Sequence, residues 1–161
     1  MKRYAGLNVN DFANGEGVCV SYFTQGCPHH CPGCFNPETW DFNGGKELPA
    51  DIRGQIIKAI CANGITRNFS VLGGEPLCPE NVEEVKNIIL GVRTAFPHIK
   101  IFVWTGYTLE ELQQKKDNNI NLILSAIDVL IDGRYKEEER DLTLKLRGSR
   151  NQRILLKNVD F

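Results

Sequence analysis

Apolar segments with the spacing of β-strands alternate along this chain with apolar segments that have the spacing of α-helices. The strand-like segments are short and rich in β-branched and aromatic residues, whereas the helical ones repeat apolar residues every three or four positions. Strands are expected at 18–25, 68–72, 99–104, 128–132 and 153–156, helices at 49–63, 79–96 and 108–116, and a further apolar stretch covers 120–127. Alternating strands and helices form right-handed βαβ units, so the sequence predicts an α/β fold with a mostly parallel sheet.

Local signals fix several ends of these elements. Gly64 is placed to end the helix at 49–63, and Pro97 follows the apolar stripe of the helix at 79–96. Thr108 and Glu111 have the spacing of a capping box that opens the next helix. The Gly73-Gly74 pair is expected to stop the strand at 68–72.

The chain has 161 residues, the length of one domain, so residues 1–161 are expected to share a single core. This length leaves room for five or six strands, fewer than the eight of a closed (β/α)8 barrel of about 250 residues. The composition is that of a globular protein, without a run long enough to span a membrane or an amino-terminal signal. Nineteen basic and twenty acidic residues balance, which gives no footprint for nucleic acid or an anionic membrane.

Three of the six cysteines lie within eight residues, in CPHHCPGC at 27–34. Six cysteines without a secretion signal indicate a cytoplasmic protein that uses thiols for metal binding or catalysis. A structural zinc site needs a fourth ligand, and the candidates are His29, His30, Cys61 and Cys78, with no second cysteine pair downstream. A [4Fe–4S] cluster fits three thiolates better, and it leaves one iron without a protein ligand, open to a small molecule.

Three loops with unusual composition follow expected strands. They are the cysteine loop, GGEP at 73–76 and TGY at 105–107. Ligands of parallel α/β sheets gather at the carboxyl ends of the strands, so these loops are expected to form one site.

The spacing Cys27-x3-Cys31-x2-Cys34, followed by GGEP after a second strand, resembles the radical S-adenosylmethionine (SAM) superfamily. More narrowly, the chain resembles the family of anaerobic ribonucleotide reductase activating proteins. The matching segments are NGEG at 14–17, CPGCFNP at 31–37, Trp40, WTGY at 104–107, DVLIDGRY at 128–135 and GSRNQR at 148–153. This resemblance covers nearly the whole chain and implies an open, partial (β/α) barrel.

The resemblance also implies the cofactors and their ligands. Cys27, Cys31 and Cys34 would ligate a [4Fe–4S] cluster, and SAM would bind the open iron through its amino and carboxylate groups. Contacts to SAM are expected from Gly33, Cys34, Phe35, Gly73, Gly74 and Glu75. Many superfamily members carry an aromatic residue just before the third cysteine, where this chain has Gly33; here Phe35 follows the cysteine. Glu75 has two alternative roles, contact with the SAM amino group or hydrogen bonds that hold its own loop.

By the same resemblance, the protein substrate is the large subunit of the anaerobic ribonucleoside-triphosphate reductase, which receives a glycyl radical. The family typically takes its electron from reduced flavodoxin. Rival functions are activation of another glycyl radical enzyme, a small-molecule radical SAM reaction such as deazapurine synthesis, and a zinc-binding or electron-transfer module without catalysis.

The remaining conspicuous residues have plain structural explanations. Cys19 and Cys61 are expected to be small buried hydrophobes, and Cys78 a spare thiol. His29 and His30 are expected to be solvated loop residues, with the alternative that either lines the entry to the site. Trp104 is expected to be a core residue, and the charged run at 136–141 a solvated face. Arg147, Arg150 and Arg153 have no assigned role.

Overall fold

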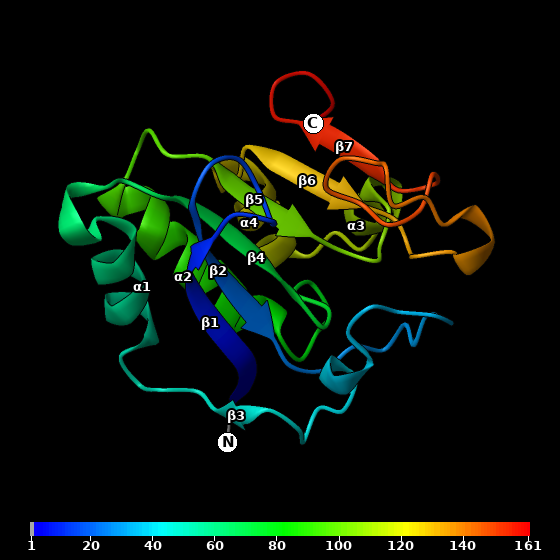
Figure 1. The fold of residues 1–161 in the computed structure, drawn as a ribbon, viewed down its shortest axis with the longest axis horizontal. Coiled ribbons are helices and arrows are strands. Elements are labelled where there is room, and N and C mark those ends of the chain that lie inside the picture. Colours follow the sequence, from blue (N-terminus) through cyan, green and yellow to red (C-terminus); the bar gives the residue numbers. More distant parts are fainter. Residues whose placement is uncertain (1) are drawn as a thin grey trace.

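Four parallel strands form the middle of one seven-stranded sheet in the computed structural model, which describes residues 2–161 (Figure 1). The order of the sheet is β3-β1-β2-β4-β5-β6-β7. The parallel strands are β2 (Cys19–Thr24), β4 (Asn68–Gly73), β5 (Ile101–Trp104) and β6 (Val129–Asp132). The expected mostly parallel sheet is confirmed.

Antiparallel strands extend the sheet at both sides. β1 (Arg3–Asp11) pairs with β2 and with the two-residue strand β3 (Lys46–Glu47), and β7 (Arg153–Leu156) pairs with β6. The expectation of five or six strands was therefore wrong. β1 mixes Tyr4, Ala5, Leu7 and Val9 with polar residues and a glycine, and pairing with the buried strand β2 stabilises it. Because β3 and β7 are the two ends of the order, the sheet is open, as expected for a partial barrel.

All four α-helices pack on one face of the sheet. They are α1 (Ile52–Ile60), α2 (Val82–Ala95), α3 (Leu109–Gln114) and α4 (Asn118–Ala126), and 3-10 turns cover Pro37–Thr39, Ala62–Gly64 and Glu137–Glu139. Alternate strand residues such as Val71, Ile101 and Val103 meet these helices in the main core. In Figure 1, α2 and α4 lie behind the sheet.

The opposite face of the sheet carries a smaller apolar cluster of Phe102, Val129 and Ile131, against which Trp104 packs. The loop between β1 and β2 also lies on this face. Gly15 has φ +133°, and a β-carbon there would lie 2.7 Å from the Cys19 sulfur, so only glycine allows this approach. Among the described residues, loops and not helices cover this face, which we call the open face; Phe102 and Ile131 are buried beneath these loops.

Most expected element ends agree with the structure to within a few residues. The capping box of Thr108 and Glu111 is present at the start of α3. The helix expected at 49–63 is shorter, because α1 ends at Ile60 and a 3-10 turn follows. Cys61 lies directly after α1 and is exposed, so the expectation that it is buried was wrong. No helix within residues 2–161 combines the length and the apolar character that crossing a membrane requires.

Candidate functional site

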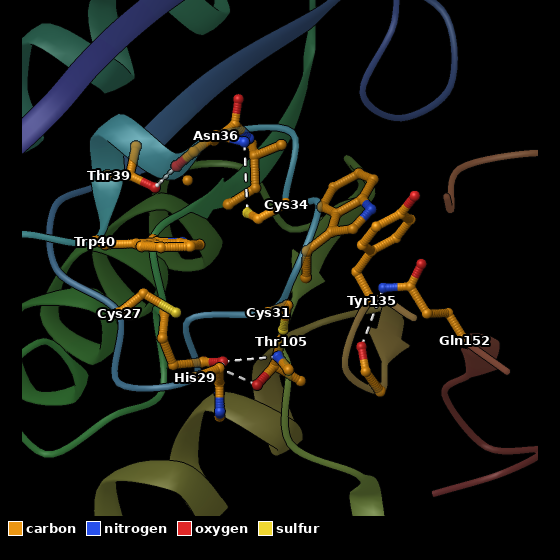
Figure 2. A pocket seen from close by; sticks show the side chains of 17 residues that line it. Cys27, His29, Cys31, Cys34, Asn36, Thr39, Trp40, Thr105, Tyr135 and Gln152 are labelled. Carbon is orange, nitrogen blue, oxygen red and sulfur yellow. Dashed lines mark hydrogen bonds and ion pairs between the residues drawn. The ribbon is translucent and has the colours of Figure 1, made fainter. Parts of the chain in front are cut away.

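Three loops at the carboxyl ends of β2, β4 and β5 meet around one pocket, as the sequence predicted. Its lining includes all three clustered cysteines, residues 72–75 and residues 104–106, together with His29, Asn36, Thr39, Trp40, Gly133, Tyr135 and Gln152. The arrowheads of β2, β5 and β6 in Figure 1 point toward the side where these loops lie. Figure 2 shows the side chains that surround the pocket.

Backbone hydrogen bonds close the cysteine loop at its base. The amide of Gly26 donates to the carbonyl of Thr39 (2.7 Å), and the amide of Cys27 donates to the carbonyl of Trp40 (3.1 Å). Farther along, the Asn36 amide donates to the sulfur of Cys34 (3.4 Å). Residues 26–40 thus form a closed loop that presents three thiols to the same pocket.

The loop after β4 is hydrogen-bonded to the start of the cysteine loop. The Gly74 amide donates to the Thr24 carbonyl (2.9 Å), and the Glu75 amide donates to the Gly26 carbonyl (2.8 Å). A β-carbon on Gly74 would lie 2.4 Å from the Gly26 carbonyl oxygen, and one on Gly73, at φ +106°, would lie 2.6 Å from the Thr24 amide nitrogen. Close contact between two protein loops therefore requires both glycines, whatever they offer to a ligand.

Glu75 is 1% exposed, and its carboxylate makes four hydrogen-bonding contacts within the protein. One oxygen accepts from the amide of Leu77 and the hydroxyl of Thr105 (both 2.8 Å); the other accepts from the amide of Gly106 (2.7 Å) and lies 2.8 Å from His29 Nε2. Of the two roles considered for Glu75, the structure shows the second, because its carboxylate holds the loops together by hydrogen bonds. This one side chain joins all three loops of the site.

His29 was expected to be solvated, and this was wrong. Its side chain is 6% exposed, because the ring binds Glu75 and packs edge-on against Tyr107 with the ring centroids 4.7 Å apart. The pattern HH in a cysteine loop gives no signal for this burial, which depends on the distant Glu75. His30 is exposed as expected, and its ring stacks on Trp40.

The thiols of the loop sit in a partly dry environment. Burial raises the pKa of Cys27 to about 11 and also raises the pKa of Cys31. Because metals bind thiolates, metal binding at these residues releases the thiol protons. All six cysteines are free. Cys19 is buried, as expected, and so is Cys78, which donates to the Glu75 carbonyl (3.2 Å).

The four candidates for a fourth zinc ligand do not form a single-ion site with the three thiols. His29 binds Glu75, His30 is exposed and stacks on Trp40, Cys78 is buried in the helix-side core, and Cys61 is exposed directly after α1. Within the described residues, no three His, Cys, Asp or Glu side chains are grouped closely enough to hold a single metal ion. A cuboidal cluster binds each thiolate at a different iron, so its ligands do not converge on one point.

Two observations fit an iron–sulfur cluster at this pocket. The donor set is three thiols from one closed loop. In addition, the indole nitrogen of Trp40, which also lines the pocket, is buried and has no hydrogen-bond partner in the described part of the chain. A buried donor left without an acceptor costs about 1–3 kcal/mol, so a group with acceptor atoms belongs beside it.

A second cavity adjoins this pocket on the open face of the sheet. The two share Cys34, Asn36, Leu72, Trp104, Tyr135 and Gln152, and the second also contacts Asn14, Phe35 and Arg147. Phe35 is half exposed and packs against Tyr135, with the ring centroids 4.9 Å apart. A β-carbon on Gly33 would meet the carboxylate of Glu137. The tip of the cysteine loop therefore packs against the segment that follows β6.

The three unassigned arginines have different surroundings. Arg153 binds the buried Asp132 and the exposed Glu110, so it stabilises the end of β6. Arg150 is exposed. Arg147 lines the second cavity, and its Nε is buried without a hydrogen-bond partner among residues 2–161. Trp104 is only partly buried. It packs on the smaller cluster, as expected for a core residue, and it also lines both cavities.

Thr105, in the TGY loop expected at the site, and Tyr135, at the end of the DVLIDGRY segment, both line the pocket, although neither was assigned a role of its own. Thr105 donates to Glu75, and the Tyr135 hydroxyl donates to the exposed Glu137 (2.6 Å). The available signal was position, because both follow parallel strands directly or within three residues.

Comparison with known proteins agrees with this geometry. Residues 13–155 match the family described as a 4Fe-4S single cluster domain. Relatives named anaerobic ribonucleoside-triphosphate reductase-activating protein are 38% identical in Escherichia coli K12 (88% of this chain, 90% of the relative), 39% identical in Pasteurella multocida (94% and 95%) and 38% identical in enterobacteria phage T4 (89% and 87%).

Proposed function

Because the chain belongs to the family of anaerobic ribonucleoside-triphosphate reductase-activating proteins, radical SAM enzymes with a 4Fe-4S single cluster domain, we propose that it generates the glycyl radical of such a reductase. The observation that carries this proposal is the convergence of three thiols of one loop with the GGEP loop around a single pocket. Residues 2–161 contain that whole arrangement on one open sheet.

Cys27, Cys31 and Cys34 would hold a [4Fe–4S] cluster by three of its irons. When bound, such a cluster would supply a low-potential electron for the reductive cleavage of SAM. With a hydrogen atom taken from a glycine α-carbon of the partner, the products would balance as methionine, 5′-deoxyadenosine and a glycyl radical on the partner.

The residues of this chain position the reactants and limit the access of water. Glu75 fixes the three loops relative to one another, so the thiols and the pocket wall keep one geometry. Trp40 and Trp104 cover two sides of the pocket with apolar surface. We assign SAM contacts to Gly33, Cys34, Phe35, Gly73, Gly74 and Glu75. What supports this is that Cys34, Gly73, Gly74 and Glu75 line the pocket, while Phe35 lines the adjoining cavity. Gly33 lines neither cavity, so its support is the family resemblance alone.

The glycine-bearing segment of the reductase would approach over the open face of the sheet, where the second cavity adjoins the first. As electron donor we propose reduced flavodoxin, for which the support is the family resemblance alone. Six free cysteines support a cytoplasmic site of action.

The test is to reconstitute the protein anaerobically with iron and sulfide, reduce it, and mix it with SAM and the anaerobic reductase. We expect 5′-deoxyadenosine by chromatography and the doublet of a glycyl radical by electron paramagnetic resonance (EPR). Cleavage of SAM without the doublet would refute the reductase as partner and favour another radical SAM reaction. A protein that binds zinc, shows no cluster absorption and releases no 5′-deoxyadenosine would refute the enzyme assignment.

A further inference from the structure

Trp40 and Trp104 are the two tryptophans of the chain, and both line the pocket. Their indole N–H groups differ in their hydrogen bonding. The Trp104 nitrogen donates to the carbonyl of Leu146 at 2.8 Å. The Trp40 nitrogen is buried and has no hydrogen-bond partner in the described part of the chain. Buried donors are nearly always paired in folded proteins, so this one points to an acceptor that the polypeptide does not supply.

The ring of Trp40 is held in place on two sides. Its backbone carbonyl accepts from the amide of Cys27 (3.1 Å), which fixes the residue beside the first cysteine of the loop. The imidazole of His30 stacks on the indole, with the ring centroids 4.7 Å apart and the planes 7° from parallel. In Figure 2 the indole extends into the pocket between the side chains of Cys27 and Cys34. The donor is therefore preorganised and does not depend on a mobile side chain.

Polar groups in the same pocket leave few acceptors for this N–H. The carboxylate of Glu75 is occupied by four contacts, and the Thr39 hydroxyl donates to the Asn36 carbonyl (2.6 Å). Cys27, Cys31 and Cys34 line the same pocket as Trp40. Sulfur atoms, of the thiolates or of a cluster bound to them, are therefore acceptors that this pocket offers.

We propose that the indole N–H of Trp40 donates a hydrogen bond to a sulfur of the cluster or of its ligating thiolates, and thereby raises the reduction potential of the cluster. This inference rests on the proposed function only in requiring that the loop holds a cluster. A hydrogen bond to sulfur stabilises the more negative, reduced form, because the N–H dipole offsets the added charge. Trp40 acts as a tuning residue, since it touches the electron carrier and not the reacting bond.

The first test measures the midpoint potential of the cluster in the reconstituted protein. A redox titration without SAM and reductase is monitored by EPR. Trp40→Phe keeps an aromatic ring to stack on His30 and removes the N–H together with one ring of the indole. We expect its midpoint to shift to a more negative value than that of the wild type. Trp104→Phe is the matched control, because its indole already has a carbonyl partner, and a clearly smaller shift is expected. Equal midpoints for the wild type and Trp40→Phe would overturn the proposal.

A second measurement leaves Trp40 itself unchanged. Wild-type protein labelled with 15N at the tryptophan indole is reduced, and pulsed EPR measures the coupling of the cluster spin to nitrogen. We expect a 15N coupling that persists in labelled Trp104→Phe. A cluster without this coupling would overturn the role of Trp40 and leave the activating function intact, whereas a preparation that assembles no cluster would overturn both.

Discussion

The Glu75 carboxylate and the His29 imidazole lie 2.8 Å apart and join the loop after β4 to the loop that carries the three cysteines. The same carboxylate accepts from Thr105 and Gly106, which belong to the loop after β5. One buried side chain thus connects the carboxyl ends of three neighbouring parallel strands.

Replacing Glu75 with glutamine is expected to lower both stability and cluster content. An amide keeps the shape but turns an NH2 group toward donors, and each buried donor left without an acceptor costs about 1–3 kcal/mol. Urea unfolding of the cluster-free protein measures the first effect, and iron content after reconstitution measures the second. Glu138→Gln, at an exposed position, is the control and should match the wild type. Wild-type stability in Glu75→Gln would mean that the four contacts contribute little.

Gly74→Ala tests the close contact between the two loops. The added β-carbon would lie 2.4 Å from the Gly26 carbonyl, so the backbone must shift, at a cost of about 1–3 kcal/mol. Gly54→Ala is the matched control: this glycine lies within α1 with open space around it, and alanine there should stabilise by about 0.5–1 kcal/mol. Thermal unfolding should therefore show shifts of opposite sign; a shift of the same sign in both would contradict the steric explanation.

Each of Cys27→Ser, Cys31→Ser and Cys34→Ser is expected to abolish assembly of an intact cluster, because serine replaces a thiolate that ligates iron. Iron and sulfide analyses after anaerobic reconstitution measure the amount of cluster in each variant. Cys61→Ser, at the exposed end of α1, should bind as much iron as the wild type. Retention of full iron and sulfide by any of the three loop variants would remove that residue from the ligand set.

How much of this could be read from the sequence depends on whether the signal was local. The parallel strands and their helices were predicted because apolar periodicity is local, and the capping box of Thr108 and Glu111 was found for the same reason. The joining of three loops in one pocket followed from the topology of parallel sheets. β1 was missed because its stability comes from pairing with β2 and not from its own composition.

Site details that depend on partners distant in the chain were not accessible. The burial of His29 follows from Glu75, forty-six residues away, and nothing in the cysteine loop indicates it. The exposure of Cys61 follows from the early end of α1 at Ile60. The sequence explained Gly73 and Gly74 by approach to SAM, whereas contact with Thr24 and Gly26 gives a sufficient reason within the protein.

Glu111 leads to a prediction about how the stability of the protein changes at acidic pH. Hydrogen bonding to Arg134, with a further bond from the Thr108 amide, lowers the pKa of Glu111 to about 2. Because its pKa is lowered in the folded state, Glu111 contributes its full stabilisation above the ordinary pKa of 4.5. This stabilisation is lost as the pH falls toward 2. Because the pair is partly exposed, we expect Glu111→Gln to cost only about 1 kcal/mol at pH 7.

The cost of Glu111→Gln should shrink as the pH falls from 4.5 to 2, and urea unfolding of the cluster-free protein at several pH values measures it. Glu138→Gln again serves as the control. A difference from the wild type that stays constant across this range would show that the effect is steric and not linked to the charge of Glu111.

Mössbauer spectroscopy of the 57Fe-reconstituted protein, recorded before and after addition of SAM, resolves whether three cysteines leave one iron of the cluster without a protein ligand. Three thiolates and one open corner predict that the parameters of one iron in four change when SAM binds, while the other three stay as they were. A spectrum in which no iron site responds to SAM, or in which the iron is present without a four-iron cluster, would contradict this structure of the metal centre.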